Sequence, residues 1–327
     1  MKKKIIFINI IVIILIIVTI EIFLNFFKIS NLMGIEKGLI KVKNDIHVMV
    51  PNSSGIHFGQ KIYIDKNGYR VPSENYKYRD ANIIYIIGDS TSFGNGIIEE
   101  KTFVGILREN FNNWDIINSS VPGYNANEYL NNIQKIDKYK NIKKIFYFLT
   151  LNDVYESSNV IDLNKDENLT TVSKFKTKNM LDKFLFINKI NAYLRSNSYL
   201  YMYLKGIVYD PSEKYYQNLI TYYKNNNIEN LQKYLNILKN KSSNKNIELK
   251  VVILPYEFQT RSCDNGILFP QKKISESLHD LDIDYYDYTM KFCNYKNPNS
   301  LFYKFDPMHL SETGHKFVYE LIKNEIN

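Results

Sequence analysis

Five short, largely apolar runs constrain the fold of this chain more than any other feature. They lie in the last three quarters of the sequence, at residues 83–87, 116–117, 145–149, 249–254 and 283–286. Runs that do not alternate with polar residues are typical of strands buried on both faces, and the stretches between them have helical periodicity. Strands separated by helices predict right-handed crossovers and a parallel sheet. The sequence therefore predicts a three-layer α/β domain, which would cover about residues 81–327.

The third and fourth runs are about one hundred residues apart, far more than a crossover helix needs. This spacing predicts an insertion at about residues 156–245. Its first part, 159–178, is polar and loop-like, and two helical apolar faces follow. The residues of these faces are Leu181, Phe184, Leu185, Ile187, Ile190 and Leu194, then Ile228, Leu231, Leu235 and Leu238. We expect a helical insertion that could cover a site as a lid.

The N-terminus has the length and charge of a membrane anchor. Residues 5–27 are apolar apart from four polar positions, and Lys2, Lys3 and Lys4 precede them. About 20 such residues span a bilayer core, and flanking lysines stay cytoplasmic. Glu21 lies near the outer end, where water is within reach. No small-x-small pair follows, which favours an uncleaved anchor over a signal peptide. The alternative is a buried core helix.

The expected anchor places the rest of the chain outside the cytoplasm, at the cell membrane. Residues 28–80 hold short alternating runs between turn signals, which predicts a small β-rich extension. Disulfides persist in oxidising compartments, so Cys263 and Cys293 could pair, although their spacing does not establish that they are close.

Composition excludes several classes of protein. The net charge is +8 and the isoelectric point about 9.0, yet the lysines are scattered and form no long block after the N-terminus, which argues against nucleic-acid binding. Two cysteines are too few for a disulfide scaffold or a Cys-rich zinc module. Asp89, Asp153 and Asp306 could be imagined as metal ligands, but no His/Cys spacing supports zinc, and we expect neither metal nor cofactor.

A serine follows the first apolar run directly. In Gly88-Asp89-Ser90 the hydroxyl would lie at the carboxyl edge of the sheet, where open α/β folds place their ligands. Ser92 stands where the nucleophile elbow of α/β-hydrolases has its second glycine, so this is not that motif. Alone, the tripeptide is more often a simple turn.

An aspartate and a histidine precede the predicted closing helix at about 311–323. A serine hydroxyl becomes a good nucleophile when a neutral imidazole accepts its proton and a carboxylate orients that imidazole. His309 and Asp306, three residues apart in Asp306-Pro307-Met308-His309, could supply both. The alternative is an ordinary polar pair at a helix start.

Two more residues follow predicted strands and could stabilise an oxyanion. Gly123, after the second strand, could bring its backbone N–H close to a substrate, and the amide of Asn152, after the third, could point over the same edge. Taken singly, Gly123 is more often a turn residue and Asn152 a strand-end cap.

Taken together, these four blocks resemble the SGNH (GDSL-like) hydrolase superfamily. Its members carry a Ser in Gly-Asp-Ser, a Gly, an Asn in an Asn-Asp pair and a C-terminal Asp-x-x-His, in the order seen here. The resemblance implies a five-stranded parallel sheet of flavodoxin-like order, with Ser90 as nucleophile, His309 as base and Asp306 as its orienter. It also implies an oxyanion hole from the Ser90 and Gly123 amides and the Asn152 side chain. Thr150 departs from the family, which commonly has a Gly there.

The resemblance also suggests a substrate class. Membrane-anchored, exported members of this superfamily act mostly on acyl esters of cell-surface polysaccharides, by deacetylation or by acetyl transfer, and often beside a multispanning membrane acyltransferase. We therefore expect an acylated surface glycan or acyl donor as partner. Two alternatives stay open: a lipase or thioesterase, and a non-catalytic, membrane-tethered glycan-binding or assembly factor.

Overall fold

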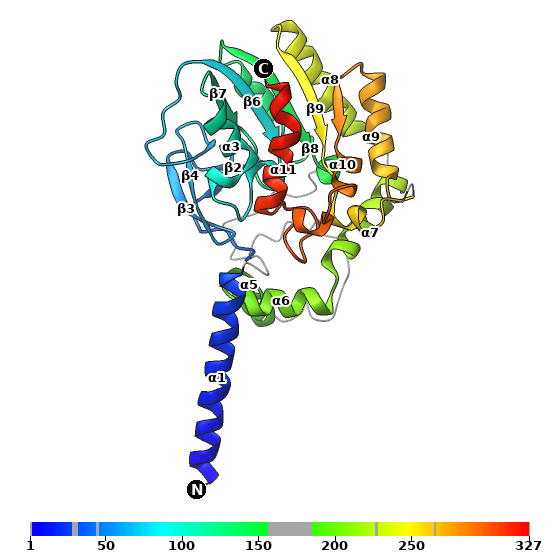
Figure 1. The fold of residues 1–327 in the computed structure, drawn as a ribbon. Helices are drawn as coiled ribbons and strands as arrows, with labels where there is room; N and C mark the ends of the chain where they lie inside the picture. Colours follow the sequence, from blue (N-terminus) through cyan, green and yellow to red (C-terminus); the bar gives the residue numbers. More distant parts are fainter. Residues whose placement is uncertain are drawn as a thin grey trace.

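The protein is an α/β domain from which a single long helix projects (Figure 1). The computed structural model describes residues 2–27, 32–43, 46–155, 185–225, 228–264 and 266–326. The projecting helix is α1 (Lys2–Phe26). Its stretch Lys3–Phe26 is long and apolar enough to cross a membrane, and nearly all of its apolar side chains are exposed.

All five predicted apolar runs form strands, and these strands are parallel. They are, in chain order, β6 (Asn82–Gly88), β7 (Trp114–Asn118), β8 (Ile142–Leu149), β9 (Glu248–Ile253) and β10 (Tyr285–Asp287). Their spatial order is β10-β9-β8-β6-β7, which is the flavodoxin-like order 2-1-3-4-5 expected above. The three-layer α/β prediction is confirmed.

The expectation of a five-stranded sheet was wrong, because strands of the N-terminal extension continue it. The added strands are β3 (Ser53–His57), β4 (Gln60–Ile64) and β5 (Arg70–Val71), and they give an eight-stranded mixed sheet. They join the edge of β7 antiparallel, where an uncovered edge would leave backbone groups unpaired. The strands β1 (Ile40–Lys43) and β2 (Ile46–Met49) form a separate hairpin.

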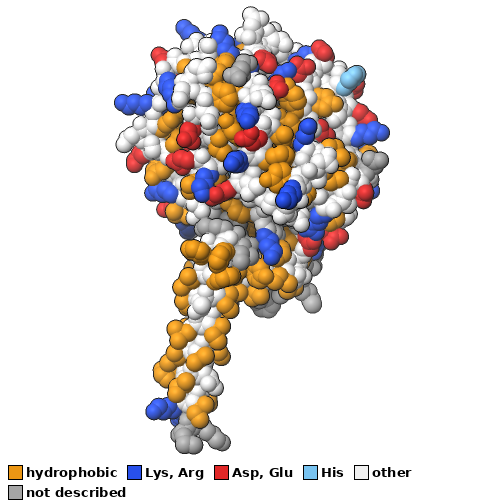
Figure 2. All heavy atoms as spheres, in the orientation of Figure 1, with side chains coloured by type: hydrophobic (Ala, Val, Ile, Leu, Met, Phe, Trp, Pro, Cys, Tyr) orange, Lys and Arg blue, Asp and Glu red, His pale blue; other side chains and the backbone are white. Residues whose placement is uncertain are grey.

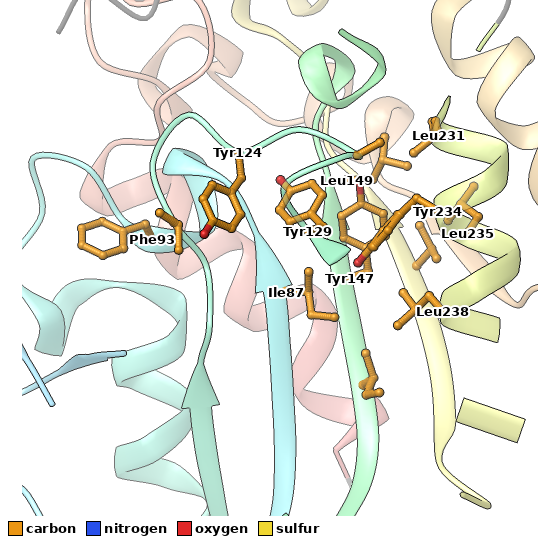
Figure 3. Packing of buried hydrophobic residues seen from close by; sticks show 14 of the residues in the cluster. Ile87, Phe93, Tyr124, Tyr129, Tyr147, Leu149, Leu231, Tyr234, Leu235 and Leu238 are labelled. Carbon is orange, nitrogen blue, oxygen red and sulfur yellow. The ribbon is translucent and has the colours of Figure 1, made fainter. Parts of the chain in front are cut away.

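Helices cover both faces of the sheet, as continuously apolar strands require. Along β6, Tyr85 and Ile87 face one buried cluster, and Ile84 and Ile86 face the other. Figure 3 shows part of the first cluster, in which tyrosine rings pack between the sheet and a flanking helix. Helices on that side are α4 (Leu130–Ile136), α8 (Glu229–Asn244) and α9 (Phe269–Asp280); on the other lie α3 (Phe103–Asn110), α10 (Thr289–Cys293) and α11 (Glu312–Ile322).

The long segment between β8 and β9 is helical where the structure describes it. Its helices are α5 (Leu185–Asn197), α6 (Tyr199–Val208), α7 (Pro211–Asn225) and α8. The predicted face of Leu231, Leu235 and Leu238 is buried against the sheet. This makes α8 the crossover helix rather than part of an insertion. Most of the other predicted apolar face, and the loop at 159–178, lie outside the described residues or side chains.

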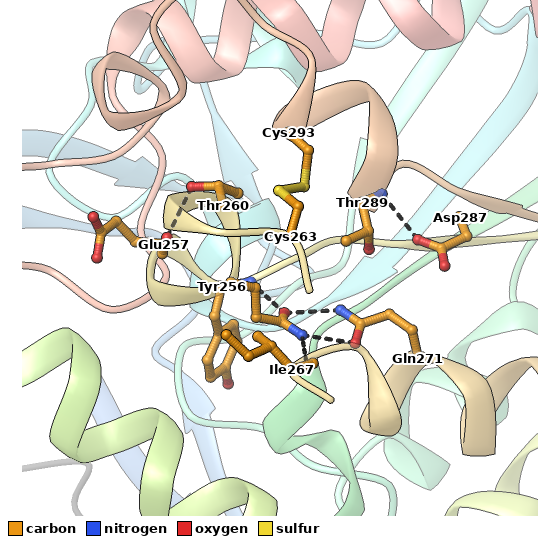
Figure 4. Close-up of a disulfide and its surroundings, with 10 residues drawn as sticks. Tyr256, Glu257, Thr260, Cys263, Ile267, Gln271, Asp287, Thr289 and Cys293 are labelled. Atoms are coloured by element: carbon orange, nitrogen blue, oxygen red, sulfur yellow. Dashed lines mark hydrogen bonds between the residues drawn. A yellow bond between two sulfur atoms is a disulfide. The ribbon is translucent and has the colours of Figure 1, made fainter. Parts of the chain in front are cut away.

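Short helices complete the chain: α2 (Ser90–Phe93), η1 (Glu99–Lys101), η2 (Leu151–Val154), η4 (Glu257–Arg261), η5 (Pro298–Leu301) and η6 (Lys323–Glu325). Cys263 and Cys293 form a disulfide that links the segment after η4 to the end of α10 (Figure 4). The pairing that the sequence left open is therefore made.

Candidate active site

Three side chains that are far apart in the sequence meet at the carboxyl edge of the sheet. Ser90 begins α2 directly after β6, while Asp306 and His309 lie between η5 and α11. The Nε2 atom of His309 is 2.9 Å from the Ser90 Oγ, and its Nδ1 is 2.8 Å from Oδ2 of Asp306. With Nδ1–H donating to the carboxylate, Nε2 is free to accept the serine proton. The structure thus brings together the predicted nucleophile, base and orienter.

The Asp306 carboxylate is held by its own loop. Its Oδ1 accepts hydrogen bonds from the backbone N–H groups of Met308, at 3.0 Å, and His309, at 2.8 Å. This leaves Oδ2 for the imidazole. The loop is closed by a hydrogen bond from Tyr303 N–H to the His309 carbonyl oxygen. The three-residue spacing therefore lets one carboxylate fix both the backbone and the ring of His309.

Burial and charge have opposite effects on the pKa of His309. Burial alone would lower the pKa of the imidazole, but the charge and hydrogen bond of Asp306, with a smaller effect from Asp89, outweigh it. The pKa of His309 is therefore raised above 6.5. The Asp89 carboxyl is fully buried, and burial raises its pKa. It caps α2 by accepting the Thr91 N–H at 2.8 Å.

The Asn152 side chain is held with its amide nitrogen toward the carboxylate of Asp89, the residue before Ser90. Tyr256 O–H donates to Oδ1 of Asn152 at 2.6 Å and also accepts the Asn152 backbone N–H at 3.1 Å. Because Oδ1 is occupied by this donor, Nδ2 points the other way, to 3.4 Å from the Asp89 Oδ2. The Ser90 Oγ lies 3.4 Å from the same oxygen. Asn152 and Ser90 thus both contact the Asp89 carboxylate.

Gly123 lies in a turn that is tied to the start of α2. Its φ of 81° is left-handed, which favours glycine, and among the described residues no atom accepts a hydrogen bond from its N–H. Val121 N–H donates to the Gly88 carbonyl oxygen. His47 of the β1–β2 hairpin bonds the Pro122 carbonyl oxygen at 2.7 Å, so the extension supports this turn.

Three residues that contact the triad or Asn152 were not predicted from the sequence. Asn95 Nδ2 lies 3.3 Å from the His309 Nε2, and the ring of Phe58 packs edge-on against the His309 ring. Tyr256, which orients Asn152, is a third. Nothing in the sequence alone assigned a role in the site to Asn95, Phe58 or Tyr256.

A buried ion cluster supports the turn that follows α2. Glu99 pairs with Arg70 of β5, at 3.1 Å, and with Arg108 of α3. Arg70 also donates to the carbonyl oxygens of Phe93 and Gly94, at 2.6 Å each, and to that of Ile97. The N-terminal extension therefore holds the backbone next to the nucleophile.

Replacing Glu99 with glutamine is expected to destabilise the domain by about 3–5 kcal/mol, because two buried guanidinium groups lose their shared counter-charge. For a domain of this size, the melting temperature should fall by roughly 10 °C. The matched control is Glu100→Gln, since Glu100 is the exposed neighbour. Thermal unfolding of the detergent-solubilised chain measures both variants. Equal melting temperatures would contradict a stabilising role for the cluster.

The aspartates considered as metal ligands do not form a metal-binding cluster in the part of the chain that the structure describes. No group of three His, Cys, Asp or Glu side chains there could hold a metal ion. Asp153, one of the three aspartates considered, accepts hydrogen bonds from Tyr129, at 3.0 Å, and Tyr147, at 2.6 Å.

Comparisons with known proteins find similar structures but no similar sequences. No family model and no curated protein matches the chain. An acetylxylan esterase from Geobacillus stearothermophilus is 10% identical, with a TM-score of 0.43, over 77% of this chain and 97% of its own. A lipase/acylhydrolase from Enterococcus faecalis is 14% identical, with a TM-score of 0.43, over 75% and 95%. A lipolytic G-D-S-L protein from Veillonella parvula is 12% identical, with a TM-score of 0.41, over 75% and 97%.

Similarity at this level carries no information on substrate or mechanism, so the assignment depends on this chain's own features. The strand order is flavodoxin-like, and Ser90 of the Gly-Asp-Ser block meets the Asp-x-x-His block from the other end of the domain. The blocks of Gly123 and Asn152 are tied to the same sheet edge. These features are the sheet order and the Ser–His–Asp arrangement that the resemblance to the SGNH (GDSL-like) hydrolase superfamily implies.

Proposed function

We propose that this protein is a membrane-anchored serine enzyme that removes or transfers O-acyl groups, foremost acetyl, on an extracytoplasmic glycan. The observation that carries the proposal is the 2.9 Å contact between Ser90 Oγ and His309 Nε2, with Asp306 behind the imidazole. Such a contact is the geometric mark of an activated nucleophile.

The reaction follows from the positions of these groups. Ser90 Oγ attacks the ester carbonyl carbon while His309 Nε2 takes its proton, and Asp306 stabilises the resulting imidazolium. The oxyanion of the tetrahedral intermediate accepts hydrogen bonds from the Ser90 and Gly123 amides and the Asn152 side chain. His309 then returns the proton to the departing alcohol, leaving an acyl group on Ser90. Water or a sugar hydroxyl attacks this acyl-enzyme and releases Ser90.

Two features support action outside the cytoplasm. The apolar stretch of α1 is long enough for a span, and its lysines are at the N-terminal end, which remains cytoplasmic by the positive-inside rule. The domain after it contains the Cys263–Cys293 disulfide, and disulfides persist in oxidising compartments. The glycan is proposed from the resemblance to exported, membrane-anchored SGNH proteins.

Replacing Asn152 with alanine is expected to lower kcat by about 10²–10³-fold with little change in KM, because an oxyanion donor acts mainly in the transition state. The control is Asn127→Ala, an exposed asparagine. Steady-state kinetics on an activated acetyl ester measure both. A change in KM alone would show that Asn152 binds the ground state instead.

The substrate is tested with the full chain in detergent micelles. Activated esters of two to twelve carbons and an acetylated oligosaccharide are supplied, with and without an unacetylated sugar acceptor. The proposal predicts preference for acetyl and Ser90-dependent loss of acetyl from the sugar, or its transfer to the acceptor. Preference for long acyl chains would indicate a lipase or thioesterase. Binding of the oligosaccharide without turnover of any ester would indicate a non-catalytic binding protein.

A further inference from the structure

The outward face of α6 is apolar, which is unusual for a helix on the surface of a domain. Leu204, Ile207 and Val208 are 53%, 57% and 87% exposed. They lie on one face of the helix by their i, i+3 and i+4 spacing. We call these three residues the α6 apolar face. Tyr193 of the adjoining α5 is also exposed. Helices on aqueous surfaces show charged and polar residues on this side.

A second face of α6, with Tyr199, Tyr203 and Gly206, packs against the domain, so the helix cannot turn its apolar face inward. Tyr203 packs edge-on against Phe305, with ring centroids 5.7 Å apart. Gly206 is buried so close to Phe305 that a Cβ at this position would collide with the ring. The Tyr199 hydroxyl lies beside Gly59.

The N-terminus of α6 is joined to the anchor helix by a carboxylate. Glu21 of α1 accepts hydrogen bonds from the Ser198 hydroxyl at 3.0 Å and from the backbone N–H groups of Tyr199 and Leu200, the latter at 2.9 Å. Glu21 is five residues before the end of α1, about 7.5 Å along the helix axis. This contact places the start of α6 at the outer end of the span.

We propose that the α6 apolar face lies in the outer surface of the bilayer, at the boundary between headgroups and acyl chains. The inference rests on the proposed role of α1 as a membrane anchor. Figure 1 shows α6 running across the domain end of α1, as a helix lying in the membrane plane would. Figure 2 shows hydrophobic side chains on α1 and on the underside of the domain beside it. An apolar face at this depth is the signature of an interfacial helix.

With α6 at the bilayer surface, the catalytic edge of the sheet faces the membrane. The carboxyl ends of β6 and β9 point to the end of the domain where α6 and α1 lie (Figure 1). Phe305, which packs on α6, directly precedes Asp306, and Phe58, which packs on His309, precedes the Gly59 that faces Tyr199. The substrate class that fits is an ester on a membrane-embedded, lipid-linked carrier.

The first test measures contact with lipid and needs no turnover. The full chain is reconstituted in phosphatidylcholine liposomes, with or without brominated acyl chains, as the variants Val208→Trp and Ile237→Trp. Ile237 is an exposed aliphatic residue on α8 and serves as the matched control. The native Trp114 gives the same background in both. Bromolipid should quench the added fluorescence of Val208→Trp several-fold more than that of Ile237→Trp. Equal quenching, as expected if a protein partner covers this face, would overturn the proposal.

The second test concerns the substrate. The double variant Ile207→Glu/Val208→Glu is compared with Ile237→Glu on a vesicle-borne acyl ester and on a soluble acetyl ester. The ratio of the two turnover rates should fall about tenfold in the double variant, which is about 1.4 kcal/mol, and stay unchanged in the control. An unchanged ratio in both would overturn the lipid-linked substrate. Quenching does not depend on Ser90. If the protein is not an esterase, quenching is still expected; if α6 does not contact the bilayer, quenching is lost while ester turnover remains.

Discussion

Replacing Ser90 with alanine is expected to lower kcat/KM on an activated acetyl ester by about 10⁴-fold or more, because the acyl-enzyme can no longer form. The Oγ is the atom that His309 contacts at 2.9 Å. KM should change little, since the hydroxyl acts on the reacting carbon and is not needed to hold the rest of the substrate. Initial rates of the detergent-solubilised chain measure this loss.

Ser92 provides the matched control for Ser90. It lies on the same short helix and is also buried, yet its hydroxyl has no hydrogen-bond partner among the described residues. Ser92→Ala should therefore keep nearly all of the activity. Equal activity of the Ser90→Ala and parent proteins would reject Ser90 as the nucleophile.

Replacing Asp306 with asparagine is expected to lower kcat by about 10⁴-fold and to move the acid limb of the pH profile to lower pH. His309 must be neutral to accept the serine proton, so kcat/KM of the parent should rise with pH through a pKa above 6.5. Without the carboxylate, burial is left as the main effect and lowers that pKa. The asparagine amide also favours the wrong tautomer, which accounts for most of the loss in rate.

The pH profile of the residual activity separates this role from a structural one. Asp284→Asn is the control, because Asp284 is an exposed aspartate paired with Lys250. It should leave both the rate and the acid limb unchanged. An Asp306→Asn variant that lost activity but kept the parent's acid limb would mean that Asp306 shapes the loop without acting on the imidazole.

The parallel part of the fold could be predicted because burial on both faces marks a strand directly in its sequence. The run at 83–87 is apolar at every position since its side chains enter two cores. The alternating runs of the extension show only that one face is buried, and they do not say where the strands pair. The extension joins the parallel strands through a single residue pair, Arg70 with Asn118. No local sequence pattern predicts this pairing.

The triad could be predicted for a related reason. Asp306 and His309 are close in sequence, and the first parallel strand ends at the edge of the sheet where the closing helix begins. The groups that position the triad could not be predicted from the sequence, because they act through contacts between distant segments. Tyr256 orients Asn152 across 104 residues. Glu99 has the same local setting as Glu100, and only the fold buries one and exposes the other.

Covalent labelling tests the central claim most directly. A fluorophosphonate reacts with a serine that an imidazole has activated, and peptide mass analysis then locates the adduct. We expect a single adduct, on Ser90, in the full chain. His309→Ala should slow the labelling strongly, and His279→Ala, a change at an exposed histidine, should leave it unaffected. An unlabelled Ser90, or a Ser90 labelled equally fast without His309, would contradict the central claim.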